Sequence, residues 1–356
     1  MAHISGVTLQ LFFAPDQLRH QPRQYMAAGR VVAPLENPDR VTMLAERLSA
    51  VGLRQFEPGE HGMAAIRAVH DGDYLAFLET AHAQWQKLPN AGEEVWPNLH
   101  PYRGTGADLD RKTPPNGGII GRAGWYMGDM AVAMGEGSWA AAYASAQTAL
   151  AATQAVLTGQ DAAYGLCRPP GHHAYRDRAC GFCFLNNAAI AAEALRQRFA
   201  KVAILDFDTH HGDGTQAIFY DRADVLVAST HTDPAAYYPF YSGFAEERGR
   251  GDGHCANLNI PLPQGADDAA YSAACEKLVD AATAFKAEAI VLSAGWDAHQ
   301  GDPLSKLAVS SQAYTAIGRI FGAMRLPTVI VQEGGYSLEA AGEAAPAFVK
   351  AFLQAR

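Results

Sequence analysis

Short apolar runs rich in β-branched residues alternate with amphipathic helical segments, and this alternation limits the fold more than any other feature of the chain. The expected strands are 7–13, 163–167, 202–207, 225–230, 289–293 and 328–332. The expected helices between them include 138–158, 187–198, 267–285 and 311–324. Such alternation is typical of a mostly parallel sheet that is covered by helices on both faces. We therefore expect an α/β fold with three layers, αβα.

Nothing in the sequence divides this alternation into separate units. Residues 1–356 contain no internal repeat and no low-complexity linker, so we expect a single domain. An insertion at about 88–118 interrupts the pattern and is rich in Pro, Gly, Asn and charge, with Trp96 and Tyr102 among them. A loop of that length is usually functional or disordered. Two interpretations stay open: a lid or subunit contact, and a merely tolerated surface insertion.

The charge balance of the chain argues against some classes of partner. Its formal net charge is −9, whereas a nucleic-acid-binding surface needs a concentrated positive field. We expect no nucleic-acid partner, and a negative protein suits a small cationic substrate. No stretch stays apolar for the ~18 residues that a membrane span needs, so no membrane partner is expected either.

The N-terminal sequence and the cysteines indicate a compartment. The first residues lack the basic leader, the apolar run and the small-residue cleavage site of a secretory signal. The five cysteines are an odd number without scaffold spacing, which fits a reducing compartment better than a secreted one. We therefore expect a cytoplasmic protein.

The candidate chemistry begins where the strand expected at 202–207 ends. This apolar run leads into the sequence DFDTHHGD, which extends from Asp206 to Asp213. The carboxyl ends of parallel strands form the ligand crevice of such sheets. The strand period of two would turn Asp206, Asp208 and His210 to one side. A single acid here would be explained as a helix cap or turn residue, but three acids with two histidines favour a metal site.

A catalytic zinc ion usually takes three protein ligands and keeps one position open. A third ligand must therefore come from another segment. Asp297 follows the apolar strand expected at 289–293, which places it at the same edge of the sheet. An acid after a strand is also a common helix cap. We expect the nearby His299 and Asp302 to be structural.

Two further loops carry groups that suit acid–base chemistry. His172 and His173 follow Arg-Pro-Pro-Gly, a stiff turn that fixes the direction of the two imidazoles. A general base needs such a fixed direction. Tyr336 follows two glycines after the strand expected at 328–332, so its hydroxyl can reach over the crevice and stabilise an oxyanion. Taken alone, a tyrosine after Gly-Gly is an ordinary turn residue.

Together these segments resemble the histone deacetylase superfamily, which has the arginase/deacetylase fold. The motifs read RPPGHHA, GFCFLNN, DFDTHHGDGT, GWDAHQGDP and EGGY, and they span residues 165–336. The first half, with HQPRQYMAAGRVVAPLENPDR and the long insertion, is more similar to bacterial acetylpolyamine amidohydrolases than to eukaryotic histone deacetylases. The resemblance implies one αβα domain and a zinc-dependent enzyme that hydrolyses the amide bond of an acetylated amine.

The resemblance also implies two metal sites. A catalytic zinc ion, with Fe²⁺ or Co²⁺ as substitutes, would be held by Asp208, His210 and Asp297. A structural potassium ion would be held by an overlapping set: Asp206, Asp208, His210, Ser229 and Thr230. An arginase-like centre with two catalytic ions is a second interpretation, but it would need more Asp and His ligands than these motifs supply.

Five residues would have catalytic roles by this resemblance. His173 would be the general base for the attacking water, and His172 a second, electrostatic imidazole. Asp206 and Asp213 would orient His172 and His173, as carboxylates behind a working histidine do. Tyr336 would donate a hydrogen bond to the substrate carbonyl. A catalytically dead acetyl-group binder is a third interpretation, disfavoured because such a protein has no use for the full acid–base set.

The substrate expectation follows from the same resemblance. Phe182 and Tyr238, with Gly181 beside them, would form a narrow channel, and Leu304 would lie at its rim. We expect acetylpolyamines such as acetylputrescine, acetylcadaverine and acetylspermidine. Acetyl-lysine in proteins and another acylated metabolite are the alternatives.

An acetylpolyamine also carries a distal ammonium group, which an acidic side chain would bind. The segment NGGIIGRAGWY, where acetylpolyamine amidohydrolases carry an acidic residue, has none. The insertion offers four acids in its place: Glu93, Glu94, Asp108 and Asp110. The resemblance and the aromatic residues of the insertion imply a homodimer whose partner helps to shape the channel.

Overall fold

The computed structural model describes residues 9–101 and 117–356. The first residues of the strand expected at 7–13, and Tyr102, Asp108 and Asp110 in the insertion, lie outside the described residues. Within the described ranges, no helix is long and apolar enough to cross a membrane.

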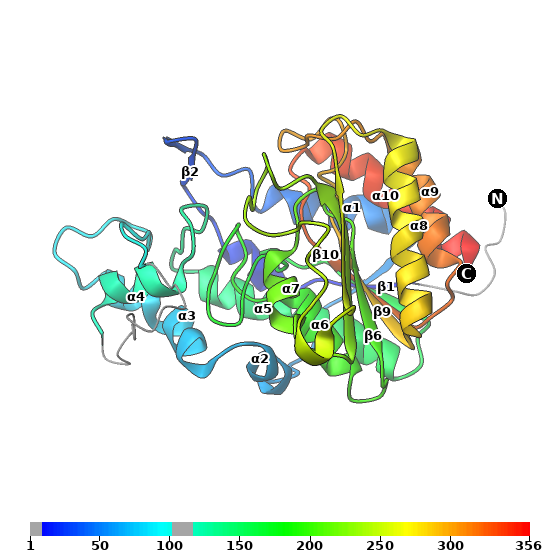
Figure 1. The fold of residues 1–356 in the computed structure, drawn as a ribbon. Helices are drawn as coiled ribbons and strands as arrows, with labels where there is room; N and C mark the ends of the chain where they lie inside the picture. The colour runs from blue at the N-terminus through cyan, green and yellow to red at the C-terminus, as the bar shows by residue number, and fades with distance from the viewer. Residues whose placement is uncertain (1–8, 102–116) are drawn as a thin grey trace.

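The centre of the molecule is an eight-stranded sheet in which every pair of neighbours is parallel. In spatial order its strands are β4 (Arg54–Phe56), β1 (Gln10–Phe12), β5 (Ala162–Gly165), β10 (Thr328–Gln332), β9 (Ala289–Ala294), β6 (Val202–Asp206), β7 (Val225–Thr232) and β8 (Asn257–Leu262). The α/β prediction is thus confirmed. A two-stranded antiparallel hairpin of β2 (Tyr25–Ala27) and β3 (Arg30–Val32) projects from the body (Figure 1).

Side chains of each central strand point alternately to the two faces of the sheet and enter different cores. In β6, Val202 and Ile204 belong to one apolar cluster, whereas Ala203 and Leu205 belong to the other. Both faces of a parallel sheet must be covered, because strands buried on two sides are apolar throughout. This alternation produces the expected αβα layering, with helices on both sides of the sheet (Figure 1).

Each layer consists of a separate set of helices. One face packs against α2 (Ala64–Val69), α3 (Gly72–Trp85), α4 (Ile119–Tyr126), α5 (Ser138–Leu157), α6 (Asn187–Leu195) and α7 (Asp213–Phe219). The other packs against α1 (Asp39–Ala50), α8 (Asp268–Phe285), α9 (Ser311–Gly322) and α10 (Leu338–Ala355).

The sequence pattern predicts the six central strands but not the two outermost, β4 and β8. β4 has only three residues, too few for a period to be visible. β8 contains two asparagines and Pro261, which are unfavourable inside a sheet. Proline is tolerated in β8 because this strand lies at the edge, where a missing amide hydrogen removes no partner.

His70 holds the loop that precedes α6 through hydrogen bonds at both ring nitrogens. It is 1% exposed; its Nδ1 lies 3.0 Å from the carbonyl of Tyr175, and its Nε2 accepts from the amide of Asn186 at 2.9 Å. An imidazole that accepts at one nitrogen must be neutral. Burial accordingly lowers the pKa of His70 to about 4.

We predict that His70→Gln removes the part of the free energy of unfolding that depends on the protonation state of His70. The unfolded state binds a proton near the ordinary histidine pKa of about 6.5, whereas folded His70 binds one only near pH 4. The contribution of a neutral His70 is therefore complete above pH 6.5 and declines as the pH falls toward 4, by about 2 kcal/mol at pH 5. Urea unfolding of both proteins at pH 7.5 and pH 5 measures this, and an unchanged difference between them would contradict it.

Candidate active site

The predicted zinc ligands and acid–base residues lie at the carboxyl ends of four adjacent strands. The order β5, β10, β9, β6 brings together four loops that are far apart in sequence. His173 follows β5, Tyr336 follows β10, Asp297 follows β9 and Asp208 follows β6. Parallel strands end at the same edge of the sheet, so these loops converge where α/β folds form their crevice.

Asp208, His210 and Asp297 form a compact group of candidate metal ligands. One ligand atom of each residue lies within 4.8 Å of the others, and all three side chains are buried. His210 Nδ1 is 3.1 Å from Asp208 Oδ1 and 3.1 Å from Asp297 Oδ2. This Asp, His and Asp set matches the ligand types that bind catalytic zinc.

The surroundings of this group fit a cation. A Cβ atom at Gly334 would lie 2.1 Å from Asp297 Oδ2, so only glycine lets the backbone approach so closely. Burial and the neighbouring Asp208 raise the pKa of Asp297 to about 7. Burial also opposes ionisation of Asp208, but His172 and His210 keep the pKa of that carboxyl low. A positive ion between two buried carboxylates reduces the electrostatic repulsion between them.

The two histidines after β5 are in different electrostatic states. His172 Nδ1 is 3.0 Å from Asp206 Oδ2, and His173 Nδ1 is 2.7 Å from Asp213 Oδ1. Burial works against a charge on His172, yet Asp208 and Asp206 raise its pKa well above the usual value. Burial and the adjacent His172 lower the pKa of His173 to about 4. His172 is therefore a cation and His173 a neutral imidazole. A general base must be neutral before it can accept a proton, so His173 is in the state of a base.

Glu333 holds the loop that carries the two histidines. Its Oε2 accepts from the amides of Gly171 at 2.6 Å and His172 at 3.1 Å, and its Oε1 from the hydroxyl of Ser293 at 3.1 Å. This carboxyl group is fully buried, and burial raises its pKa to about 7. Glu333 thus connects the ends of β5, β9 and β10.

Tyr336 is placed by contacts to its backbone and ring. Asp302 Oδ2 accepts from the amides of Tyr336 at 2.6 Å and Ser337 at 2.8 Å, so the structural role expected for Asp302 is present. The guanidinium carbon of Arg40 lies 4.6 Å from the centre of the Tyr336 ring. Burial raises the pKa of Tyr336 well above its ordinary value, so the phenol remains a hydrogen-bond donor.

The four residues expected to line the substrate channel surround these groups. The ring of Phe182 is 5.8 Å from that of Tyr336, and the ring of Tyr238 is 4.9 Å from that of His173, at 88°. A Cβ atom at Gly181 would lie 2.5 Å from the His173 ring, so this position requires glycine. Leu304 is half-buried and accepts a hydrogen bond from Tyr237 through its carbonyl.

The residues expected to hold potassium lie on adjacent strands. Asp206 on β6 is opposite Ser229 on β7 in the register of the sheet. Ser229 Oγ is 2.8 Å from His231 Nδ1, and the hydroxyl of Thr230 donates to the carbonyl of Ile260 at 3.2 Å. Thr230 therefore turns its hydroxyl toward β8, not toward Asp206.

The chain is similar to known proteins over most of its length. Residues 34–352 match the model of the histone deacetylase domain. The chain belongs to the histone deacetylase family. This deacetylase is 46% identical to an acetylpolyamine amidohydrolase of Burkholderia pseudomallei, over 96% of this chain and 98% of that protein. It is 39% identical to acetylpolyamine amidohydrolase 2 of Pseudomonas aeruginosa, over 93% and 94% of the two chains.

The fold comparison agrees with the sequence comparison. A crystal structure of an acetylpolyamine aminohydrolase from Burkholderia pseudomallei matches with a TM-score of 0.93 and 45% identity, covering 98% of this deacetylase and 100% of that chain. The deacetylase is thus an enzyme of the amide-hydrolysing class, as the sequence analysis predicted.

Sequence reasoning missed several residues that surround the site of this deacetylase. They are Glu36, Arg40, Asp129, Tyr237 and Glu333. Asp129 Oδ2 accepts from the Tyr238 hydroxyl at 2.7 Å and from the Gly181 amide at 3.0 Å. The sequence pointed to two of these residues. Glu333 belongs to the EGGY motif, and Asp129 comes three residues after the segment NGGIIGRAGWY, which contains no acid.

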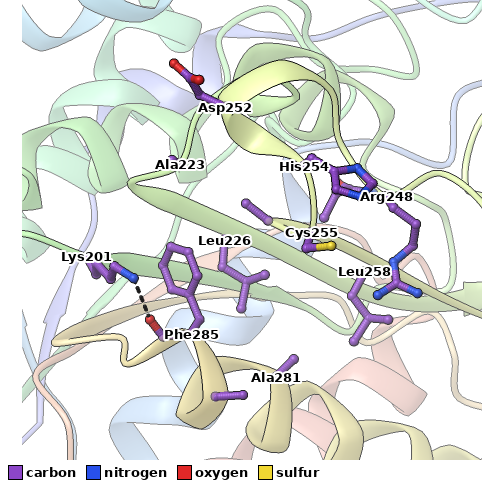
Figure 2. A pocket seen from close by; sticks show the side chains of 13 residues that line it. Lys201, Ala223, Leu226, Arg248, Asp252, His254, Cys255, Leu258, Ala281 and Phe285 are labelled. Atoms are coloured by element: carbon purple, nitrogen blue, oxygen red, sulfur yellow. Dashed lines mark hydrogen bonds between the residues drawn. The ribbon is translucent and has the colours of Figure 1, made fainter.

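A cavity of about 480 Å³ lies elsewhere, at the amino ends of β6, β7 and β8. Figure 2 shows Lys201, Leu226 and Phe285 on its walls. None of the predicted site residues lines it, so it is separate from the candidate active site.

Proposed function

We propose that this deacetylase is a zinc-dependent amidohydrolase that removes the acetyl group from acetylpolyamines and releases acetate. The observation that carries the proposal is the candidate metal group Asp208, His210 and Asp297 in the same crevice as the neutral imidazole of His173. Two of its relatives support the substrate class, since both are named acetylpolyamine amidohydrolases.

Asp208, His210 and Asp297 would hold the zinc ion. Bound there, zinc would polarise the amide carbonyl and lower the pKa of water from 15.7 to about 7. The three side chains are buried, so they would exclude bulk solvent from one side of the ion.

The residues of the chain divide the proton transfers between them. His173 takes the proton from the attacking water at Nε2, because its Nδ1 faces Asp213; such general base catalysis typically contributes about 100- to 10,000-fold. His172, kept cationic by Asp206 and Asp208, stabilises the negative charge that develops on the substrate. Tyr336 donates from its hydroxyl to the carbonyl oxygen. The leaving amine then receives a proton from the histidine pair.

The channel supports a small cationic substrate. Phe182 and Tyr238 offer aromatic walls for an alkyl chain, and Asp129 places a carboxyl group behind them. The acids of the insertion that the structure describes are engaged elsewhere: Glu93 pairs with Arg23, and Glu94 Oε1 accepts from the Arg23 amide at 2.9 Å. We therefore propose Asp129, which contacts Tyr238 and Gly181, as the acid for a distal ammonium group.

We also propose the potassium site and the homodimer that the resemblance implied. The register of Asp206 opposite Ser229 supports the first. The homodimer follows from the resemblance to acetylpolyamine amidohydrolases.

Acetate release from acetylputrescine, acetylcadaverine, acetylspermidine and an acetyl-lysine peptide at matched concentrations tests the function. We expect the zinc-loaded protein to prefer the acetylpolyamines, and a chelated sample to be inactive. Preference for the peptide would instead identify a protein deacetylase. Lack of turnover on all four would overturn the proposal in favour of another acylated metabolite or an acetyl-group binder.

A further inference from the structure

The ring of His210 makes a contact on the side opposite the candidate metal group. Tyr237 is 9% exposed, and its ring stacks on that of His210 with centroids 4.9 Å apart and planes at 17°. The Tyr237 hydroxyl oxygen lies 2.9 Å from His210 Nε2. The same hydroxyl donates to the carbonyl of Leu304 at the channel rim.

These two contacts determine where the hydrogens lie. A backbone carbonyl can only accept, so the single hydroxyl hydrogen of Tyr237 points to Leu304. The hydroxyl oxygen then faces His210 with a lone pair, which requires a hydrogen on Nε2. The other ring nitrogen, Nδ1, remains directed at Asp208 Oδ1 and Asp297 Oδ2, each 3.1 Å away.

We propose that Tyr237 is a positioning residue for the metal site, whose hydroxyl oxygen accepts the Nε2 hydrogen of His210 and so directs Nδ1 toward Asp208 and Asp297. The inference rests on the metal site of the proposed function. Hydrogen bonds behind a metal-binding histidine fix its ring orientation and tautomer, and their loss typically lowers metal affinity by about 10- to 100-fold. Because the same hydroxyl contacts Leu304, it also connects the metal group to the rim of the channel.

The substitution Tyr237→Phe tests this with little other change. Phenylalanine keeps the stacked ring and removes only the hydroxyl, so the buried Nε2 hydrogen of His210 loses its acceptor when Nδ1 binds the ion. We expect the zinc dissociation constant, measured by competition with a chromogenic chelator, to rise by about 10- to 100-fold. The zinc concentration needed for half-maximal activation should rise in parallel.

Tyr238→Phe is the matched control. It removes a hydroxyl from the neighbouring tyrosine, but that hydroxyl bonds to Asp129 and not to His210. Zinc affinity should stay within about twofold of wild type in this variant, against the 10- to 100-fold change expected for Tyr237→Phe. Equal affinities in all three proteins would overturn the inference. They would leave the proposed function intact if wild type still hydrolyses acetylpolyamines.

A second measurement does not depend on folding of the variant. In cadmium-substituted wild-type protein labelled with nitrogen-15 in histidine, the ring whose nitrogen couples to cadmium is His210, the one histidine of the ligand group. We expect its Nε2 hydrogen to exchange slowly with solvent, as a buried hydrogen-bonded donor does. A rapidly exchanging Nε2 hydrogen, or coupling of cadmium to Nε2, would contradict the inference.

Discussion

Replacing Asp297 by Asn is expected to abolish metal binding and activity while making the metal-free protein more stable. The activity should fall by at least about a thousandfold, since the chemistry that the ion supplies is lost with it. The stability gain follows from charge. Asp297 is fully buried close to Asp208, and burial and this neighbour raise its pKa to about 7. The resulting destabilisation of the metal-free fold builds up from the unfolded pKa of about 4 and is complete above pH 7, so at pH 8 a neutral amide should add on the order of 2 kcal/mol.

Thermal unfolding with and without zinc provides the measurement. At pH 8 in chelator, Asp297→Asn should unfold at a higher temperature than wild type, and with zinc the order should reverse, because only wild type gains from the ion. Asp267→Asn is the control, since Asp267 caps α8 through the amide of Ala270 and Asn caps equally well. A variant that still responds to zinc would remove Asp297 from the ligand set.

Replacing Tyr336 by Phe is expected to leave the metal in place and to remove most of the activity. The hydroxyl is proposed to act on the substrate carbonyl, and loss of one such donor lowers kcat by about 100- to 1,000-fold. The ring contacts to Phe182 and Arg40 need no hydroxyl. Zinc content and the unfolding temperature should therefore match wild type.

Steady-state kinetics on the best acetylpolyamine, with zinc quantified in the same samples, separates the two effects. Tyr241→Phe serves as the control because this tyrosine is 92% exposed, and its kcat should be unchanged. Full activity in Tyr336→Phe would exclude the phenol from the mechanism, whereas a loss of zinc would reassign it to the metal site.

Much of the site could be predicted because its residues follow apolar strands directly. Asp208 and Asp297 each come just after a buried run, so strand position and residue type together indicate a shared edge. The motif sequences around His173 and Tyr336 then gave the family, and the comparisons confirm it. These inferences succeed because backbone direction alone brings such residues together.

The supporting contacts could not be predicted, because they depend on side chains that cross between distant segments. Arg40 Nη2 donates to the carbonyl of Glu333 at 2.8 Å and Nη1 to Glu36 at 3.1 Å, and Arg168 Nε reaches Glu36 at 2.7 Å. In sequence, Arg40 is one of many charged residues on an amphipathic helix. Only its 2% exposure distinguishes it from a solvated cation.

The position of β10 has a consequence for how the enzyme becomes active during synthesis. This last strand lies in the interior of the sheet, between β5 and β9, and its register pairs Val329 with both Ala163 and Val291. A ribosome has made nearly the whole chain before β10 emerges, so the sheet is completed only near the end of synthesis. Among the described strands, only β10 joins β5, which precedes the histidine loop, to β9 and β6, which precede the metal ligands. Pairing of β10 with both neighbours is therefore required before the base and the metal ligands belong to one continuous sheet.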